Sequence, residues 1–213
     1  DYENATVTDI NGETRQFVPA EYSIKNDLYS QNQIDFIDKY LNNLFKIVYE
    51  ACENGKYYKF DENYDLVDSN VTTAEEAVSN VMDMDSVRDM YILYEIVHDY
   101  DCGEGSFYMC VDLSKDSKCP KLKFTSPWDF NWAYNDSTEK YYAGAFTDKN
   151  FVAKKGDRSN PWFIVLCKQD WFMDAVKEKW TEMSREKLLQ GCIKAEREYL
   201  KEYDADLRKG EEW

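Results

Sequence analysis

Residues 83–98, with the sequence DMDSVRDMYILYEIVH, place apolar side chains around almost the whole circumference of a helix. The apolar positions are Val87, Met90, Tyr91, Ile92, Leu93, Tyr94, Ile96 and Val97. A helix that is apolar on nearly every side is stable in water only when other elements cover it. The pattern therefore predicts a helix at the centre of a domain, capped at its start by Asp85 or Ser86.

An acidic loop follows this helix. In DYDCGEGS, Asp99, Asp101 and Glu104 surround two glycines, and His98, the single histidine of the chain, comes just before them. Because neighbouring carboxylates repel one another, fold stability alone gives a poor reason for this arrangement. Two explanations stay open at this point: a solvated connection with a chance run of charge, or a loop that holds a proton acceptor and a cation.

The next residues have the pattern of a β-hairpin with a second acid at its exit. The inward-facing apolar positions are Phe107, Met109 and Val111 on the first arm and Leu122 and Phe124 on the second, around the turn SKDSKCP. Asp129 follows in PWDFN. Since a hairpin brings its two ends together, we expect Asp101 and Asp129 to face one cleft.

Two aspartates that share a cleft suit phosphotransfer. One accepts the proton of an attacking hydroxyl, and the other holds Mg²⁺ against the phosphates. In protein kinases a metal-binding residue stands five positions after the catalytic aspartate, and an Asp-Phe-Gly triplet follows a hairpin. Here these positions hold Ser106 and the triplet Asp129-Phe130-Asn131, while the flanking Trp128 and Trp132 read as core residues.

The rest of the chain predicts an α+β, mostly helical protein. Residues 30–52 form an amphipathic helix with a cap at Ser30 or Asn32, residues 53–70 form a polar, Tyr-rich connection, and residues 161–183 contain a short apolar segment and a further helix. We expect the last helix to break or kink near Gly191. Residues 1–27 are expected to be N-terminal strands, and residues 28–213 one helical domain.

Composition limits the classes of partner. The formal net charge of −16 argues against binding to nucleic acid or to an anionic membrane, and no apolar run is long enough to span a bilayer. The six cysteines include no C-x-x-C pair, which argues against structural zinc. For Cys110 and Cys119 a cross-strand disulfide and buried thiols both stay open, as do a secreted and a reduced cytosolic origin.

Five stretches of the chain resemble the CotH kinase family, named from spore coat protein H. They are IDFIDKYLNNLFKIVYEA, MDMDSVRDMYILYEIVHDYD, SFYMCVDL, FTSPWDFNWAY and NPWFIVLCKQDWFMDAVKEKWTEM, and PWDFN is the most specific piece. The resemblance implies an atypical protein-kinase-like fold, of which this chain would be the C-terminal lobe with a central β-hairpin. The family's N-terminal lobe, with its nucleotide-binding Lys and Arg, would precede residue 1, and a separate polypeptide could supply it.

Carried over by position, the resemblance makes Asp101 the catalytic aspartate and Asp129 a metal ligand. Ser106, where the family often has Asn, would be a second metal ligand, and Asp99 replaces another usual Asn. The implied cofactors are ATP and Mg²⁺ or Mn²⁺.

The implied acceptor is a serine or threonine of a protein. Bacterial members of the family are implicated in phosphorylating spore-coat proteins, and others occur on secreted cell-surface proteins. We therefore expect a secreted or cell-surface location, with the spore coat or the cytoplasm as the alternative. A non-catalytic adhesion or scaffold module that keeps the kinase shape is the alternative function, and a two-carboxylate glycosidase is a third.

Overall fold

The computed structural model describes residues 6–8, 14–16, 22–97, 102, 105–132 and 160–210. The chain divides into two compact units, Asp1–Met173 and Asp174–Trp213. The domain boundary expected at residues 27 and 28 stays a prediction.

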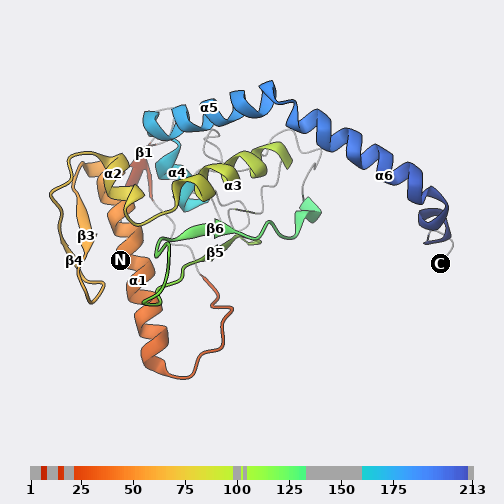
Figure 1. Ribbon diagram of the computed structural model, residues 1–213. Coiled ribbons are helices and arrows are strands. Elements are labelled where there is room, and N and C mark those ends of the chain that lie inside the picture. Colours follow the sequence, from red (N-terminus) through yellow and green to blue (C-terminus); the bar gives the residue numbers. More distant parts are fainter. Residues whose placement is uncertain are drawn as a thin grey trace. The chain divides into compact units, whose positions relative to one another are not determined.

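The first unit combines helices with three small antiparallel sheets (Figure 1). In chain order its described elements are β1 (Thr6–Thr8), β2 (Thr14–Gln16), α1 (Gln31–Asn54), β3 (Tyr58–Phe60), β4 (Leu66–Asp68), α2 (Ala74–Ser79), α3 (Met84–Val97), β5 (Tyr108–Cys110), β6 (Lys123–Thr125), the 3₁₀ turn η2 (Phe130–Trp132) and α4 (Pro161–Leu166). Each sheet is a pair of strands adjacent in this order: β1 with β2, β3 with β4, and β5 with β6. The prediction of an α+β, mostly helical chain is confirmed.

Helix α1 begins where the sequence predicted. The backbone N–H groups of Tyr29 and Ser30 donate to Oε1 of Gln33 at 2.7 and 3.2 Å, which satisfies donors at the helix start. The helix ends at Gly55, whose φ of 62° lies in the left-handed region that glycine adopts without strain. Its buried face contributes Leu44, Ile47 and Val48 to the core.

Helix α3 is central, as its sequence predicted. Val87, Met90, Tyr91, Ile92 and Tyr94 are all buried. The cap expected at Asp85 or Ser86 is in fact Asp83: its Oδ1 accepts from the N–H of Ser86 at 3.1 Å. The side chain of Ser86 instead donates to the carbonyl of Asp83 at 2.7 Å, so the serine belongs to the first turn and not to the cap.

The predicted hairpin is confirmed by β5 and β6, which pair Tyr108 with Thr125 and Cys110 with Lys123. Phe124 of β6 is 2 % exposed. Its ring lies 4.7 Å from Phe107 and 5.6 Å from Phe163 of α4, centroid to centroid, in edge-to-face geometry. The hairpin is thus fixed to the helical core through its second arm.

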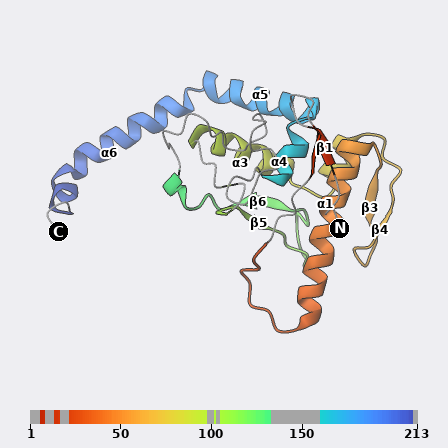
Figure 2. The same cartoon turned by 180° about the vertical axis from the view of Figure 1, so that it is seen from behind.

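The Tyr-rich segment, which the sequence predicted to be a polar connection, contains the short hairpin β3–β4. Phe60 and Tyr64 pack on Tyr40 of α1, with ring centroids 5.4 and 5.6 Å away. Figure 2 shows α1 between this hairpin and the β5–β6 hairpin, an arrangement also visible in Figure 1. The aromatic side chains of the segment therefore have a packing role.

Helix α5 (Asp170–Arg185) begins in the first unit, and the second unit contains its remainder and α6 (Leu188–Gly210). The break expected near Gly191 lies earlier, at Lys187, whose φ is 54°. Gly191 is an ordinary helical residue of α6. None of the described helices combines the length and apolarity needed to cross a bilayer.

Candidate functional site

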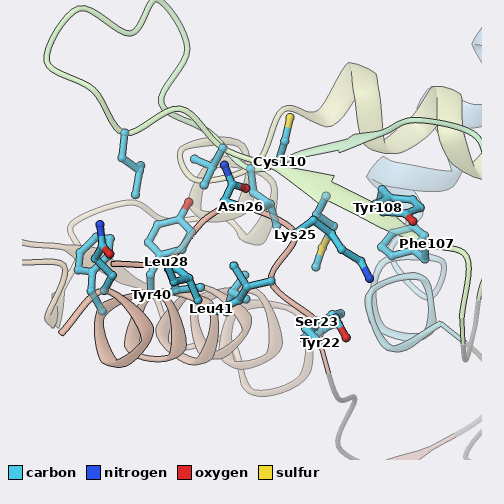
Figure 3. A pocket seen from close by; sticks show the side chains of 18 of the residues that line it. Tyr22, Ser23, Lys25, Asn26, Leu28, Tyr40, Leu41, Phe107, Tyr108 and Cys110 are labelled. Atoms are coloured by element: carbon cyan, nitrogen blue, oxygen red, sulfur yellow. The ribbon is translucent and has the colours of Figure 1, made fainter. Parts of the chain in front are cut away.

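A pocket of about 910 Å³ lies between residues 22–28, the first turns of α1 and strand β5 with its flanking residues. Figure 3 shows Leu28, Tyr40 and Leu41 on the α1 side, and Phe107 and Tyr108 on the strand side. Concave sites of this size with mostly apolar walls are typical of small-molecule binding.

The segment 22–28 supplies both charged side chains of the pocket lining, Lys25 and Asp27, together with polar Ser23 and Asn26. Its first described residue is held by α4: Nε1 of Trp162 donates to the Tyr22 hydroxyl at 2.9 Å. Trp162 is itself 1 % exposed, so the segment is fixed to the core at this point.

The acidic loop borders the same pocket through Cys102, Gly105 and Ser106, which are among its lining residues. The predicted catalytic residue Asp101 lies outside the described residues, as do His98, Asp99 and Glu104. Since Cys102 follows Asp101 directly in the chain, the pocket lies next to the segment that carries the aspartate. The meeting of Asp101 with Asp129 stays a prediction.

Tyr94 of α3 connects the two ends of the β5–β6 hairpin. Its ring centroid lies 6.1 Å from that of Phe107 and 6.3 Å from that of Phe130, and its hydroxyl donates to the Ser106 carbonyl at 3.4 Å. Tyr94 is fully buried. One core residue therefore contacts both segments that the sequence assigned to a site.

Asp129 is an exposed carboxylate at the exit of the hairpin, with a φ of 59°. Ser106 and Ser126 also have positive φ, of 44° and 54°. Such backbone is costly for residues other than glycine and concentrates at functional sites. Among the described residues, three of the five residues other than glycine that have a positive φ thus lie at the ends of this one hairpin.

Trp128, expected in the core, is 59 % exposed and packs edge-to-face on Tyr108, 6.3 Å away between centroids. The expectation is wrong because residues 126–129, which follow β6, are all exposed and therefore lie outside the core. Cys110 and Cys119 form no disulfide, and neither is buried. Cys110 pairs with Lys123 across the hairpin, and the Sγ of Cys119 instead lies 3.7 Å from Asp83 Oδ2.

Within the described part of the chain, no three His, Cys, Asp or Glu side chains gather as a metal cluster would require. Mg²⁺ is commonly held by only one or two carboxylates together with substrate phosphates. An exposed carboxylate such as that of Asp129 fits this kind of binding, in which the substrate completes the ligand set.

Asn160 is a residue of the site that sequence reasoning missed. It is 1 % exposed and lines the pocket. Its Oδ1 accepts from the N–H groups of Trp162 and Phe163 at 3.1 and 3.3 Å, and its Nδ2 donates to the Cys102 carbonyl at 2.9 Å. The dipeptide Asn-Pro at a helix start signals the capping role, but no local pattern reveals the bond to Cys102, 58 positions away.

A family model described as CotH kinase protein matches residues 22–208. The chain belongs to the CotH kinase family. Comparison with curated proteins and with solved structures gives no match. The CotH match extends over both the pocket and the β5–β6 hairpin, and the family description indicates kinase-like activity as the class of function.

Proposed function

We propose that this CotH protein transfers phosphate from ATP to a serine or threonine hydroxyl of a protein. The observation that carries the proposal is the pocket beside Cys102 and Ser106, because Cys102 directly follows Asp101 in the acidic loop and Ser106 stands at the end of this loop. In this family the corresponding loop is expected to contain the catalytic aspartate. The chain would be the kinase-like C-terminal lobe, with residues 1–27 leading from the N-terminal lobe.

Asp101 would orient the acceptor hydroxyl and take its proton. The hydroxyl oxygen forms a bond to the γ-phosphorus, the bond from that phosphorus to the bridging oxygen breaks, and ADP leaves with the electron pair. Most of the acceleration in such a reaction comes from positioning and electrostatic stabilisation. The carboxylate of Asp101 must therefore be held in place relative to the nucleotide.

Asp129 and Ser106 would hold Mg²⁺ or Mn²⁺. When bound, the cation would neutralise charge on the phosphates. The exposed position of Asp129 leaves its carboxylate accessible to a nucleotide-bound cation. We propose the side-chain hydroxyl of Ser106 as its ligand atom, while the carbonyl of the same residue accepts a hydrogen bond from the Tyr94 hydroxyl at 3.4 Å.

The pocket would receive the adenosine part of ATP. Aromatic and aliphatic walls from Tyr40, Leu41 and Phe107 suit a flat base, while Lys25 and Asn26 offer polar atoms. Further phosphate contacts would come from the Lys and Arg of an N-terminal lobe, either in the same polypeptide or in a partner chain. We propose a secreted or cell-surface setting for the acceptor protein.

The test is a labelling experiment with the full-length gene product. We expect radiolabelled ATP with Mg²⁺ or Mn²⁺ to label an acceptor protein or the enzyme itself, and Asp101→Ala to lower the rate by about a hundredfold or more. Asp112→Ala, which removes an exposed carboxylate after β5, is the matched control and should label like the wild type.

Equal labelling by the wild type and Asp101→Ala would contradict the catalytic assignment. If neither protein transfers phosphate and neither binds ATP with Mg²⁺, the alternative of a non-catalytic adhesion or scaffold module is favoured. The serine at position 106, in place of the family's frequent asparagine, is the observation that favours that alternative.

A further inference from the structure

The side chain of Asn160 joins two parts of the molecule that are remote in the sequence. At one end its Oδ1 caps α4, and at the other end its Nδ2 donates to the Cys102 carbonyl at 2.9 Å. Both functional groups of the amide are therefore used, and the residue is 1 % exposed. A buried amide with this bonding has one preferred orientation, since rotation by 180° would place an acceptor against the carbonyl.

Helix α4 provides a rigid base for this contact. All six of its residues are buried, including Trp162, Phe163 and Leu166. Phe163 contacts Tyr91 of α3 and Phe124 of β6, with ring centroids 5.2 and 5.6 Å away. Asn160 is thus mounted on an element that is fixed to the central helix and to the hairpin.

Cys102 is the residue directly after Asp101, and it is 1 % exposed. The loop meets the core again at Ser106, whose carbonyl accepts from Tyr94. The Asn160 bond is the shorter of the two, at 2.9 Å against 3.4 Å. It also lies closer in the chain to the aspartate.

We propose that Asn160 is a positioning residue for phosphotransfer, which fixes the backbone beside Asp101 by its hydrogen bond to Cys102. The inference rests on the proposed function, because it needs Asp101 to be the residue that orients the acceptor. Asn160 acts through the loop and contacts no reacting atom. Although Asn160 borders the pocket, both groups of its amide are bonded within the protein and the residue is only 1 % exposed, so its loss should lower kcat and leave ATP binding nearly unchanged.

The test separates the two roles of the side chain. Asn160→Asp keeps an oxygen that can cap α4 but replaces the amide donor to Cys102 by a second acceptor. Asn160→Ser also keeps a capping oxygen, but its side chain is too short to reach the Cys102 carbonyl at the same time. It replaces the aspartate variant in the test if that variant folds poorly. Thr73→Ala is the matched control, since it removes the cap of α2, where Oγ1 of Thr73 accepts from Glu76 at 3.2 Å.

The first measurement needs no kinase activity. The full-length protein is treated with iodoacetamide, and the alkylation rate of each cysteine is followed by peptide mass spectrometry. We expect Cys102 to react about tenfold faster in both Asn160 variants, because the loop opens more often without the hydrogen bond. Cys167, 7 % exposed in α4's C-cap, should stay slow and so report that the core is intact.

The second measurement is steady-state phosphotransfer. Both Asn160 variants should lose about tenfold or more in kcat with a KM for ATP within about twofold of the wild type, whereas Thr73→Ala should change neither. An unchanged Cys102 rate overturns the inference, and so does a faster Cys102 with a wild-type kcat. If the wild type transfers no phosphate, the proposed function is overturned, and the inference with it. This outcome is distinguished from the other two because the measurement on the wild type is sufficient to establish it.

Discussion

The surroundings of Glu95, in the last turn of α3, change the pKa of its carboxyl group. Burial raises the pKa of its carboxyl to about 7, and a hydrogen bond from the Tyr91 hydroxyl opposes this only in part. Its Oε1 is buried without a hydrogen-bond partner. Cys167 lies beside the same tyrosine, and burial raises the pKa of its thiol well above the usual value.

This environment predicts a pH-dependent stability. The unfolded chain releases the Glu95 proton near pH 4.5, whereas the folded protein keeps it until about pH 7, so the folded state binds more protons in this window. The contribution of Glu95 to the unfolding free energy should fall by about 1–3 kcal/mol as the pH rises through the window. We expect Glu95→Gln to remove this fall, as measured by urea unfolding at pH 5, 6 and 7.5.

Glu62→Gln, at an exposed position in the β3–β4 turn, should keep the wild-type slope. If Glu95→Gln and the wild type lose stability equally between pH 5 and 7.5, the buried carboxyl does not govern the response.

At the scale of elements, the β5–β6 hairpin decides where the site residues lie. Its pairing of Tyr108 with Thr125 brings the segments ending in Ser106 and beginning with Ser126 to the same end of the ribbon. Phe124 attaches the ribbon to the core through Phe107, Phe163 and Trp162, whose ring centroids are 4.7, 5.6 and 6.0 Å away. The hairpin is therefore supported by packing and not by its few strand hydrogen bonds alone.

Phe124→Ala should lower the unfolding free energy by about 3–5 kcal/mol, because it leaves a cavity among three aromatic rings. Val67→Ala, in β4 at 38 % exposure, should cost less than about 1 kcal/mol. Urea unfolding followed by circular dichroism measures both. Similar small losses for the two variants would show that the hairpin contributes little to the core.

The elements that sequence predicted well are those with a long or strict apolar pattern. Helix α3 was predicted from apolar residues around its whole circumference, and α1 from apolar residues at helical spacing. The β5–β6 hairpin was predicted from the alternation around Met109 and Phe124. Strands β3 and β4 are as short as β5 and β6, with three residues each, but they lie in a polar segment in which no apolar alternation extends beyond the strands. Their stability comes from contacts with Tyr40 of α1. Tertiary packing of this kind has no local signal.

Only those parts of the site that have a local sequence pattern could be predicted. The hairpin and the acids at its ends could be read from the sequence, and Asp129 lies at the hairpin exit as expected. The pocket could not be predicted, because it combines residues 22–28, α1 and β5. The Asn160 bond to Cys102 could not be predicted either, since 58 positions separate the two residues and only the packing of α4 brings them together.

For the whole molecule, the dominant property is the formal net charge of −16. A protein with this charge repels a free nucleotide polyanion unless a cation accompanies it. The walls of the pocket that would receive the base are largely uncharged, with Tyr40, Leu41 and Phe107 among them. The base and the phosphates should therefore respond differently to divalent cations.

We expect ATP binding to depend strongly on Mg²⁺, whereas adenosine binding should not. In calorimetric titrations of the full-length protein, ATP in EDTA should bind at least about tenfold more weakly than ATP with Mg²⁺, and adenosine should change by less than about twofold. Asp129→Asn should reduce the gain from Mg²⁺ without affecting adenosine. Raising the salt concentration in EDTA should strengthen the binding of ATP alone, because screening weakens the repulsion from the acidic protein. Equal affinity for ATP with and without Mg²⁺ would contradict the metal role of Asp129, because the phosphates would then be bound by cationic side chains of the protein and not through a cation.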